Sequence, residues 1–429
     1  MRTGIACWIP TWGLAAATLI LLSVTAPPSA ASDALPDTTQ AAAPLRQALA
    51  EAWRQHPAAL SAERKLAAAR ARAIAAGGPI YNPEVELAAD DEGPDRIRTV
   101  GLSQTLDLSG KRRARRAVGD AELAGAEARY TLQSAEFARD WLTGWTKWLA
   151  ARRQVELGEQ RVALAERLAG LAERQRLVGD ISSPERDLVL LTRDEALAEQ
   201  ATLLADSATA EEAFTRVGGN AGVLASLRLP EAPPPITRMG VEGVVTGLPE
   251  FRVSLAEANV AQQRIAVADR DRRPDPTVSL RGGRIDMGEA SGSVIGMSIA
   301  VPLFVRNSYR AEAVAARADA AGADADMERL RLELQARAES AARIYIAVRE
   351  AWAAWHRSRG TDLAARSNAL ERLWQAGELS TADYVLQIKQ TLDTALAGAA
   401  LDGRVWQSYF DYLYAVGQLD EWSGLGAPP

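Results

Sequence analysis

The chain has 429 residues, with 49 Lys and Arg against 55 Asp and Glu, so its formal net charge is −6. Because the cations are mixed with anions along a negative chain, the pattern is typical of solvated helix faces and not of a nucleic-acid-binding surface. Hydrophobic residues make up 48% of the chain and aromatic residues only 6%, so alanine carries much of the apolar content, which favours closely packed helices.

The N-terminus has the features of a secretory signal peptide, which we assign to residues 1–31. Arg2 precedes an apolar stretch at 13–24, and Ser29-Ala30-Ala31 offers a small-residue cleavage site. The alternative is a retained N-terminal anchor. Residues 32–43 are small and polar and predict a flexible leader. No later stretch is long and apolar enough to cross a bilayer as a helix, so we expect any further membrane entry to use strands.

The rest of the chain reads as two copies of one unit. Five landmarks recur in the same order, 192 to 199 positions apart: Pro57 and Pro249, Pro83 and Pro276, Gly101 and Gly296, Gly179 and Gly377, and Gly218 and Gly417. We therefore predict structural repeats at 44–219 and 241–418. A Pro-rich linker at 220–240 joins them, extended at 229–235. Residues 419–429 are expected to form a C-terminal tail.

Each repeat predicts helix, strand, turn, strand, long helix, short break and helix. Alternating apolar residues indicate strands at 84–89, 97–108, 277–280 and 293–303, with an acidic loop at 90–95 and a Gly-rich connection at 282–292. The long helices are expected at 111–178 and 309–376. Helices of about 68 residues would run about 100 Å, which indicates coiled-coil packing.

Four strands per chain are too few to close a membrane barrel, because a spanning sheet must leave no free edge and the smallest usual barrels have eight strands. Any membrane-embedded sheet must therefore pool strands from several copies. Three copies would supply twelve strands, with the long helices extending the conduit away from the membrane. The residues alone thus predict a mainly α-helical protein with a β-barrel part, assembled as an oligomeric tube.

Several segments of the sequence resemble those of a known protein family. Three segments resemble the TolC-type outer-membrane efflux factors: Asn82-Pro83-Glu84, the stretch from Gly101 to Arg112 ending in Asp-Leu-Ser-Gly-Lys-Arg, and Gln375-Ala-Gly-Glu-Leu-Ser-Thr-Ala-Asp-Tyr-Val-Leu386. The resemblance implies a homotrimer with a twelve-stranded outer-membrane β-barrel continued by a long periplasmic α-helical barrel. Such a trimer is the exit duct of a tripartite efflux system, in outer-membrane lipid, with a periplasmic adaptor and an inner-membrane pump of the resistance-nodulation-division type.

The form of the motif at 103–112 looks most like the cobalt–zinc–cadmium and copper–silver branch, which implies export of heavy-metal cations. Export of drugs or other organic solutes is the alternative. The chain departs from many relatives in one respect. These are lipidated at an N-terminal cysteine, whereas Cys7, the only cysteine, precedes the apolar core of the signal.

Two groups of residues follow the breaks between the long helices and the helices after them. The resemblance implies that the turns are hairpin tips that dock the adaptor: Gly179, Asp180, Ser182, Gly377, Glu378 and Ser380. The competing interpretation is an ordinary turn, in which Gly reverses the backbone and Ser caps the next helix. Asp383, and less strongly Glu185, are candidates for like-charged rings at the closed periplasmic aperture; otherwise they are exposed first-turn carboxylates.

A basic cluster follows the first strand pair: Lys111, Arg112, Arg113, Arg115 and Arg116. In an exported protein it is expected to face phospholipid headgroups where strand becomes helix, with interhelical ion pairs as the alternative. Trp141, Trp145 and Trp148 follow helical spacing and predict helix packing.

No pattern predicts catalysis, a cofactor or a tight metal site. His56 and His356 are isolated from each other and from Cys7, and no nucleophile–base or paired-carboxylate grouping is evident. We therefore predict that the protein is not an enzyme. The remaining alternatives are a periplasmic coiled-coil scaffold or adaptor without a pore, and an exported hydrolase with a helical insert.

Overall fold

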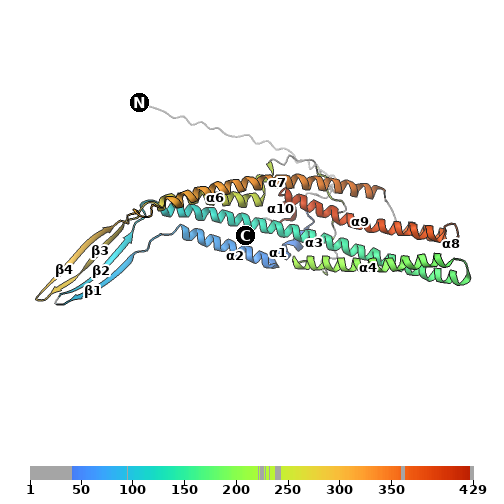
Figure 1. Ribbon diagram of the computed structural model, residues 1–429, viewed down its shortest axis with the longest axis horizontal. Helices are drawn as coiled ribbons and strands as arrows, with labels where there is room; N and C mark the ends of the chain where they lie inside the picture. The colour runs from blue at the N-terminus through green and yellow to red at the C-terminus, as the bar shows by residue number, and fades with distance from the viewer. Residues whose placement is uncertain are drawn as a thin grey trace, which may run out of the picture. The chain divides into compact units, whose positions relative to one another are not determined.

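A computed structural model describes residues 41–93, 95–220, 222, 227, 229–230, 232–236, 243–358 and 363–425. The predicted signal peptide at 1–31 and residues 32–40 of the predicted leader lie outside the described residues. Long helices and one four-stranded sheet make up the fold (Figure 1). Among the described residues, no helix has a stretch that is long and apolar enough to cross a lipid bilayer.

The helices follow the predicted duplication. The first repeat contains α1 Ala43–Gln55, α2 Pro57–Ala76, α3 Lys111–Val178 and α4 Ser183–Arg216; the second contains the 3-10 turn η2 Val245–Gly247, α6 Pro249–Asp271, α7 Arg310–Ser358, α8 Leu363–Gln375 and α9 Thr381–Ala415, followed by α10 Leu419–Ser423. Pro57 and Pro249 each occupy the first position of a helix, after a residue in extended conformation. Proline suits this position because its missing N–H would have no helical partner.

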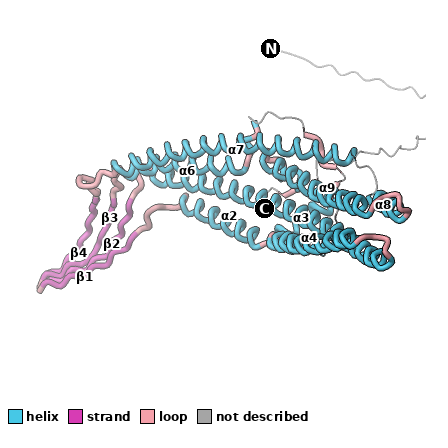
Figure 2. The backbone as a smooth tube through the Cα atoms, turned by 45° about the vertical axis from the view of Figure 1, so that its right-hand side comes forward, coloured by secondary structure: helices cyan, strands magenta, loops and turns pink. Residues whose placement is uncertain are grey.

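The helix α3 is the central element of the helical part. Its N-terminal half packs against α2 at Gly119 and against α6 at Gly125, where only small side chains fit between the helices. Its C-terminal half packs against α4 and α9, and α7 packs against α6 and α9 (Figures 1 and 2). The predicted bounds of α3, 111–178, are confirmed.

The second long helix, predicted at 309–376, is described in two parts. The structure has α7 to Ser358 and α8 from Leu363 to Gln375, and residues 359–362 between them lie outside the described part.

The sheet is antiparallel with strand order β1-β2-β3-β4: β1 Glu84–Glu92, β2 Asp95–Thr105, β3 Thr277–Met287 and β4 Ala290–Ala300. The central pair, β2 and β3, joins the two repeats, while β1 and β4 each have one unpaired edge. Two predicted loops are wrong in extent. Residues 90–92 and Gly282–Gly283 lie within strands, because the ladder with neighbouring strands outweighs their low strand propensity.

The two faces of the sheet differ along the half nearer the helices. One face carries the cross-strand row Val85–Leu102–Leu280–Met297 and the row Leu87–Val100–Gly282–Ile295. The other face carries Glu84–Ser103–Ser279–Ser298 and Glu86–Gly101–Arg281–Gly296. The large apolar residues of the first face are exposed in the single chain. The sheet therefore presents an apolar face that no described part of this chain covers.

The main hydrophobic core lies where the two repeats meet at mid-length of α3. Trp141 and Trp145 are fully buried and Trp148 nearly so, which confirms the predicted helix packing. Leu419 and Trp422 of α10 join this core, and the Ala41 N–H donates to the Trp422 carbonyl oxygen at 2.9 Å. Residues 41–43 and 419–425 are thus parts of the packed structure, which corrects the predicted leader and tail at these positions; 426–429 lie outside the described residues.

Tyr345 and Arg349 of α7 donate to the carbonyl oxygens of Pro234 and Pro233 in the predicted linker.

Candidate functional site

The two hairpin turns have the same backbone geometry. Gly179 and Gly377 adopt left-handed conformations, with φ of 87° and 75°. In the first turn the Gly179 N–H donates to Arg176 and the Asp180 N–H to Gln175; in the second, the Gly377 N–H donates to Trp374 and the Glu378 N–H to Leu373. This pair of bonds is the Schellman motif, which satisfies the last carbonyl groups of a helix.

Each turn is followed by a serine cap, as the sequence indicates. The Ser182 hydroxyl accepts from the Glu185 N–H at 3.4 Å, while the Glu185 carboxylate accepts from the Ser182 N–H at 2.7 Å, a complete capping box. The backbone N–H and then the hydroxyl of Ser182 lower the pKa of Glu185. In the second turn, the Asp383 N–H donates to the Ser380 hydroxyl at 3.1 Å, and that hydroxyl donates to the Asp383 carboxylate at 2.7 Å.

The turns differ in what they expose. Next to Gly179, Leu177 and Val178 are 85% and 72% exposed, an unusual pair of apolar side chains at a turn. Next to Gly377, Trp374 stacks on Tyr384 with ring centroids 4.8 Å apart, and its indole N–H donates to Thr381 at 3.2 Å. The α3–α4 turn therefore ends in an exposed apolar tip, whereas the α8–α9 turn is stiffened by an aromatic stack.

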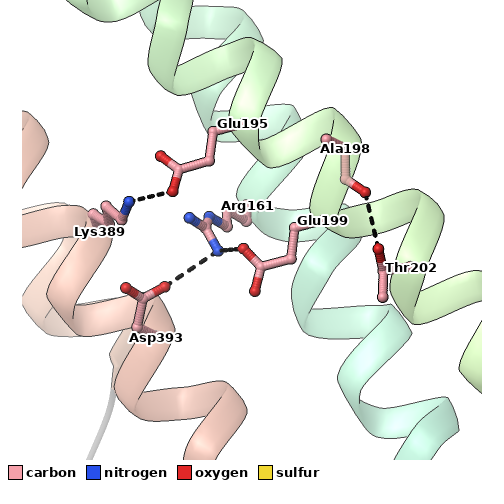
Figure 3. A network of polar contacts seen from close by, with 7 residues as sticks. All are labelled: Arg161, Glu195, Ala198, Glu199, Thr202, Lys389 and Asp393. Atoms are coloured by element: carbon pink, nitrogen blue, oxygen red, sulfur yellow. Dashed lines mark hydrogen bonds and ion pairs between the residues drawn. The ribbon is translucent and has the colours of Figure 1, made fainter.

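An ion-pair network ties the two hairpins together (Figure 3). Arg161 of α3 is only 5% exposed; its guanidinium binds the Glu199 carboxylate of α4 and lies 3.2 Å from the Asp393 carboxylate of α9. Beside it, Lys389 of α9 binds Glu195 of α4, and Thr202 donates to the Ala198 carbonyl within α4. The sequence analysis missed this network, because no local motif relates Arg161 to Asp393.

The basic cluster at the start of α3 is not uniform. The Lys111 ammonium is buried and lies 2.9 Å from the Asp275 carboxylate, to which the Tyr81 hydroxyl also donates at 2.8 Å. Burial and this hydrogen bond raise the pKa of Tyr81 to about 12. In this chain Lys111 therefore faces a protein carboxylate, which corrects the prediction that it faces headgroups. Arg112, Arg113, Arg115 and Arg116 are exposed.

Asp107 explains why α3 begins where it does. Its carboxylate accepts from the backbone N–H groups of Lys111 and Arg112, both at 2.8 Å, and Gly110 before them is left-handed with φ of 75°. Burial acts to raise the pKa of Asp107, but these N–H groups and the Lys111 charge lower it overall. A carboxylate at the N-terminus of a helix also suits the macrodipole.

Both histidines have structural partners. His56 accepts from the Ala58 N–H at 3.2 Å at the start of α2, and His356 lies 3.0 Å from the Asp402 carboxylate, which also accepts from Trp352. Within the described part of the chain, no three residues of the types His, Cys, Asp and Glu are grouped to hold a metal ion.

Comparison with known proteins identifies the fold. The sequence matches no protein-family model and no curated protein. Solved structures do match: the outer membrane protein VceC of Vibrio cholerae has 17% identity, covers 87% of this chain and 96% of its own, and gives a TM-score of 0.69. The CmeC outer membrane channel of Campylobacter jejuni has 14% identity over 90% of this chain and 87% of its own, with a TM-score of 0.71. The chain has the TolC-type outer-membrane channel fold.

CusC, whose structures concern transmembrane channel formation, is similar to the same degree, with 14% identity, 87% of this chain and 91% of its own covered, and a TM-score of 0.67. These structures span nearly the whole chain, so the predicted fold class, strands included, is confirmed. All three solved structures are membrane or channel proteins and none is an enzyme.

Proposed function

We propose that this chain is the outer-membrane exit duct of a tripartite efflux system, a passive conduit assembled as a homotrimer. The observation that carries the proposal is the sheet, which has an exposed apolar face and two unpaired edges on a chain with the channel fold. An unpaired edge is unstable in lipid, because its backbone N–H and C=O groups find no partner there. Pairing β4 of one copy with β1 of the next would remove all edges and close twelve strands.

The apolar face has the height that a membrane barrel requires. In β4, Ile295, Met297 and Ile299 alternate on one side, and the exposed Val301 and Leu303 continue the spacing in the sequence after the strand. The alternation from 295 to 303 covers nine residues, within the roughly 9–11 residues that a tilted membrane-spanning strand needs. Toward the β-turns the same face becomes charged, with Arg96, Arg98 and Arg284. The opposite, polar face would line the lumen.

With the sheet in the membrane, the remaining segments of the chain can be placed as well. The signal peptide at 1–31 would be removed on export, leaving the repeats 44–219 and 241–418 joined by 220–240. The exposed arginines Arg112, Arg113, Arg115 and Arg116 lie where strand becomes helix, the depth at which anionic headgroups attract cations. The long helices would form the periplasmic barrel, with the hairpin turns farthest from the membrane.

We propose that the hairpin turns dock a periplasmic adaptor, which couples the duct to an inner-membrane pump of the resistance-nodulation-division type. The exposed apolar pair Leu177 and Val178, next to Gly179 and Asp180, supports a protein contact. Replacing both with Glu should abolish copurification of the adaptor and leave the trimer mass unchanged. Leu204→Glu, at an exposed leucine of α4 away from the turn, is the control. Copurification that survives the double change would exclude docking at this tip.

We propose Asp383 as the main charged ring of the periplasmic aperture, with Glu185, at the equivalent position of the first repeat, in a lesser role. Three like charges around one axis bind cations and resist close approach. Asp383→Ala should therefore raise ion leakage through the trimer several-fold and weaken its block by divalent cations. Asp206→Ala, an exposed carboxylate of α4, is the matched control. Equal leakage and equal block in Asp383→Ala and the wild type would reject this assignment.

We infer heavy-metal cations as the cargo, on the form of the segment ending in Asp107-Leu-Ser-Gly-Lys-Arg112. Drugs or other organic solutes are the second candidate, because the similarity to solved channel structures does not distinguish the two classes of cargo. Deleting the gene and measuring resistance to copper, silver, zinc and cobalt against a panel of drugs would separate the two.

The experiment that tests the duct itself is single-channel conductance of the purified protein in planar bilayers, paired with its mass in detergent. A trimer that conducts supports the proposal. A monomer without conductance would reject it and favour the alternative of a coiled-coil scaffold without a pore.

A further inference from the structure

A cavity of about 800 Å³ lies at the junction of the sheet and the helices, between the start of α3, the end of α6 and the start of α7. Its volume is in the range of sites that hold a whole small molecule. Of its lining residues, only Arg115 and Lys111 of the basic cluster at the start of α3 have been assigned a role above. Its wall includes Phe304 and Tyr309 from the segment that connects β4 to α7, and this segment also exposes Leu303 and Val305.

The charges of this cavity are separated by sign. Cations come from α3 and from the middle of α6, as Lys111, Arg115 and Arg264; anions come from the end of α6 and from α7, as Asp271, Glu312 and Asp319. Lys111 is committed to Asp275, and Arg264 to Glu122 at 2.9 Å. In the described part of the chain, Arg115, Asp271, Glu312 and Asp319 have neither an ion-pair nor a hydrogen-bond partner. The cavity thus offers one free guanidinium and three free carboxylates.

Two aromatic side chains, Phe304 and Tyr309, form the wall of the cavity nearest the sheet. Tyr309 has a φ of 52°, rare for a residue with a side chain, and its N–H donates to the Asn307 side chain at 3.0 Å. This conformation places its ring edge-on to Phe304, with centroids 5.0 Å apart. Aromatic residues with one polar end are favoured where apolar and aqueous phases meet.

We propose that this cavity binds the headgroup of a zwitterionic phospholipid, with phosphoethanolamine as the chemistry that fits. The phosphate would bind Arg115, and the ammonium group would bind Glu312 and Asp319. The acyl chains would lie against Leu303 and Val305. A lipid with an anionic, amine-free headgroup would satisfy Arg115 but leave the carboxylates facing its charge. The inference rests on the proposed function, because it requires the sheet to lie in a membrane.

Native mass spectrometry of the detergent-solubilised protein tests this directly. The probes are palmitoyl-oleoyl phosphatidylethanolamine and phosphatidylglycerol at equal concentration, and the readout is the ratio of the two lipids retained. We expect phosphatidylethanolamine to be retained preferentially. The double variant Glu312→Gln, Asp319→Asn should lower the ratio about fivefold, the factor expected for loss of a partly screened ion pair. Arg115→Gln should weaken retention of both lipids with less change in their ratio.

Matched controls keep the test specific. Glu211→Gln on α4 and Arg404→Gln on α9 remove exposed charges away from the cavity and should leave the ratio unchanged; neither residue has an ion-pair partner in the described part of the chain. The same spectra report the oligomer mass, so a variant that fails to assemble is recognised. A wild-type ratio near one, or a ratio unaffected by the carboxylate changes, would overturn the proposal.

Soluble glycerophosphoethanolamine, which has the headgroup without acyl chains, distinguishes a lipid site from an aqueous one. If it displaces the lipid at equal concentration, the cavity recognises a soluble amine and the lipid assignment is wrong. Conductance of the same preparation is read in parallel. If the wild-type protein conducts but shows no preference between the two lipids, only the lipid site is rejected. If the wild-type protein does not conduct, the duct itself is rejected.

Discussion

At the scale of single residues, Asp420 at the start of α10 is the clearest electrostatic cost in the described structure. One of its carboxylate oxygens is buried without a hydrogen-bond partner, and burial raises its pKa from 3.8 to about 6. Because the pKa of Asp420 is higher in the folded state than in the unfolded state, the protonated carboxyl favours folding. This contribution to the free energy of unfolding is fully present below about pH 4 and is lost as pH rises through about 6. The charged form therefore weakens the attachment of α10 to the core at neutral pH.

Replacing Asp420 with Asn should stabilise the protein at pH 7.5 by about 2 kcal/mol, the value for such a pKa difference after allowance for partial exposure. It should also remove the contribution of Asp420 to the pH dependence of the melting temperature, which is a gain in stability of the wild type as pH falls from 7 to 4. Thermal unfolding of the detergent-solubilised protein across this range measures both effects. Glu421→Gln, at the exposed neighbour, should keep the wild-type profile, and an Asp420→Asn profile parallel to the wild type would contradict the assignment.

At the scale of elements, the contact between α7 and α9 depends on a missing side chain. A Cβ atom on Gly398 of α9 would lie 2.1 Å from the Trp355 ring of α7, so the indole occupies the space that the glycine leaves. Gly398→Ala should therefore displace the ring and cost about 1–3 kcal/mol, as overpacked sites do. Gly322→Ala in α7 provides a control of opposite sign. No atom lies within 4 Å of its Cβ position, so helix propensity should stabilise by up to about 1 kcal/mol. Equal melting temperatures for the two variants would show that the α7–α9 contact is not tightly packed.

Among the elements, the ion-pair network of Arg161 links the α3–α4 hairpin to α9 beside the hydrophobic contacts that join the same helices. Its carboxylates are 40% and 46% exposed, so its contribution to stability is smaller than that of a fully buried pair. A single guanidinium of α3 nevertheless contacts one carboxylate on α4 and one on α9, so it favours one alignment of these helices.

At the scale of the whole molecule, the proposed barrel requires opposite environments for adjacent residues of β4. Met297 belongs to the apolar row, whereas Ser298 belongs to the polar row on the other face. Met297→Arg should block stable membrane insertion, since an arginine on the lipid face near mid-membrane costs about 2–4 kcal/mol per copy. Ser298→Arg should insert normally and change conductance, because it would add three cations to the lumen. Fractionation followed by conductance measures both. If the two variants behave alike, the assigned faces are wrong.

The sequence by itself determined the features that depend on near neighbours along the chain. Gly179 and Gly377 turn the backbone because each needs only its own left-handed conformation and carbonyl groups three or four residues earlier. The bounds of α3 follow from local signals at both ends, Asp107 and Gly110 before it and Gly179 after it. Alternation along each strand likewise determined which residues share a face.

Only the tertiary structure decided what depends on partners distant in the chain. The sequence predicts Lys111 as one of five exposed cations, but in the folded chain its ammonium group pairs with the Asp275 carboxylate. The sequence predicts a loop at Gly282 and Gly283, but in the folded chain β2 and β4 pair with these residues on both sides. The Arg161 network and the cavity at the sheet–helix junction each draw residues from three helices. Local backbone conformation depends on residues adjacent in the sequence. Burial and charge pairing depend on which helices and strands lie next to each other in the fold.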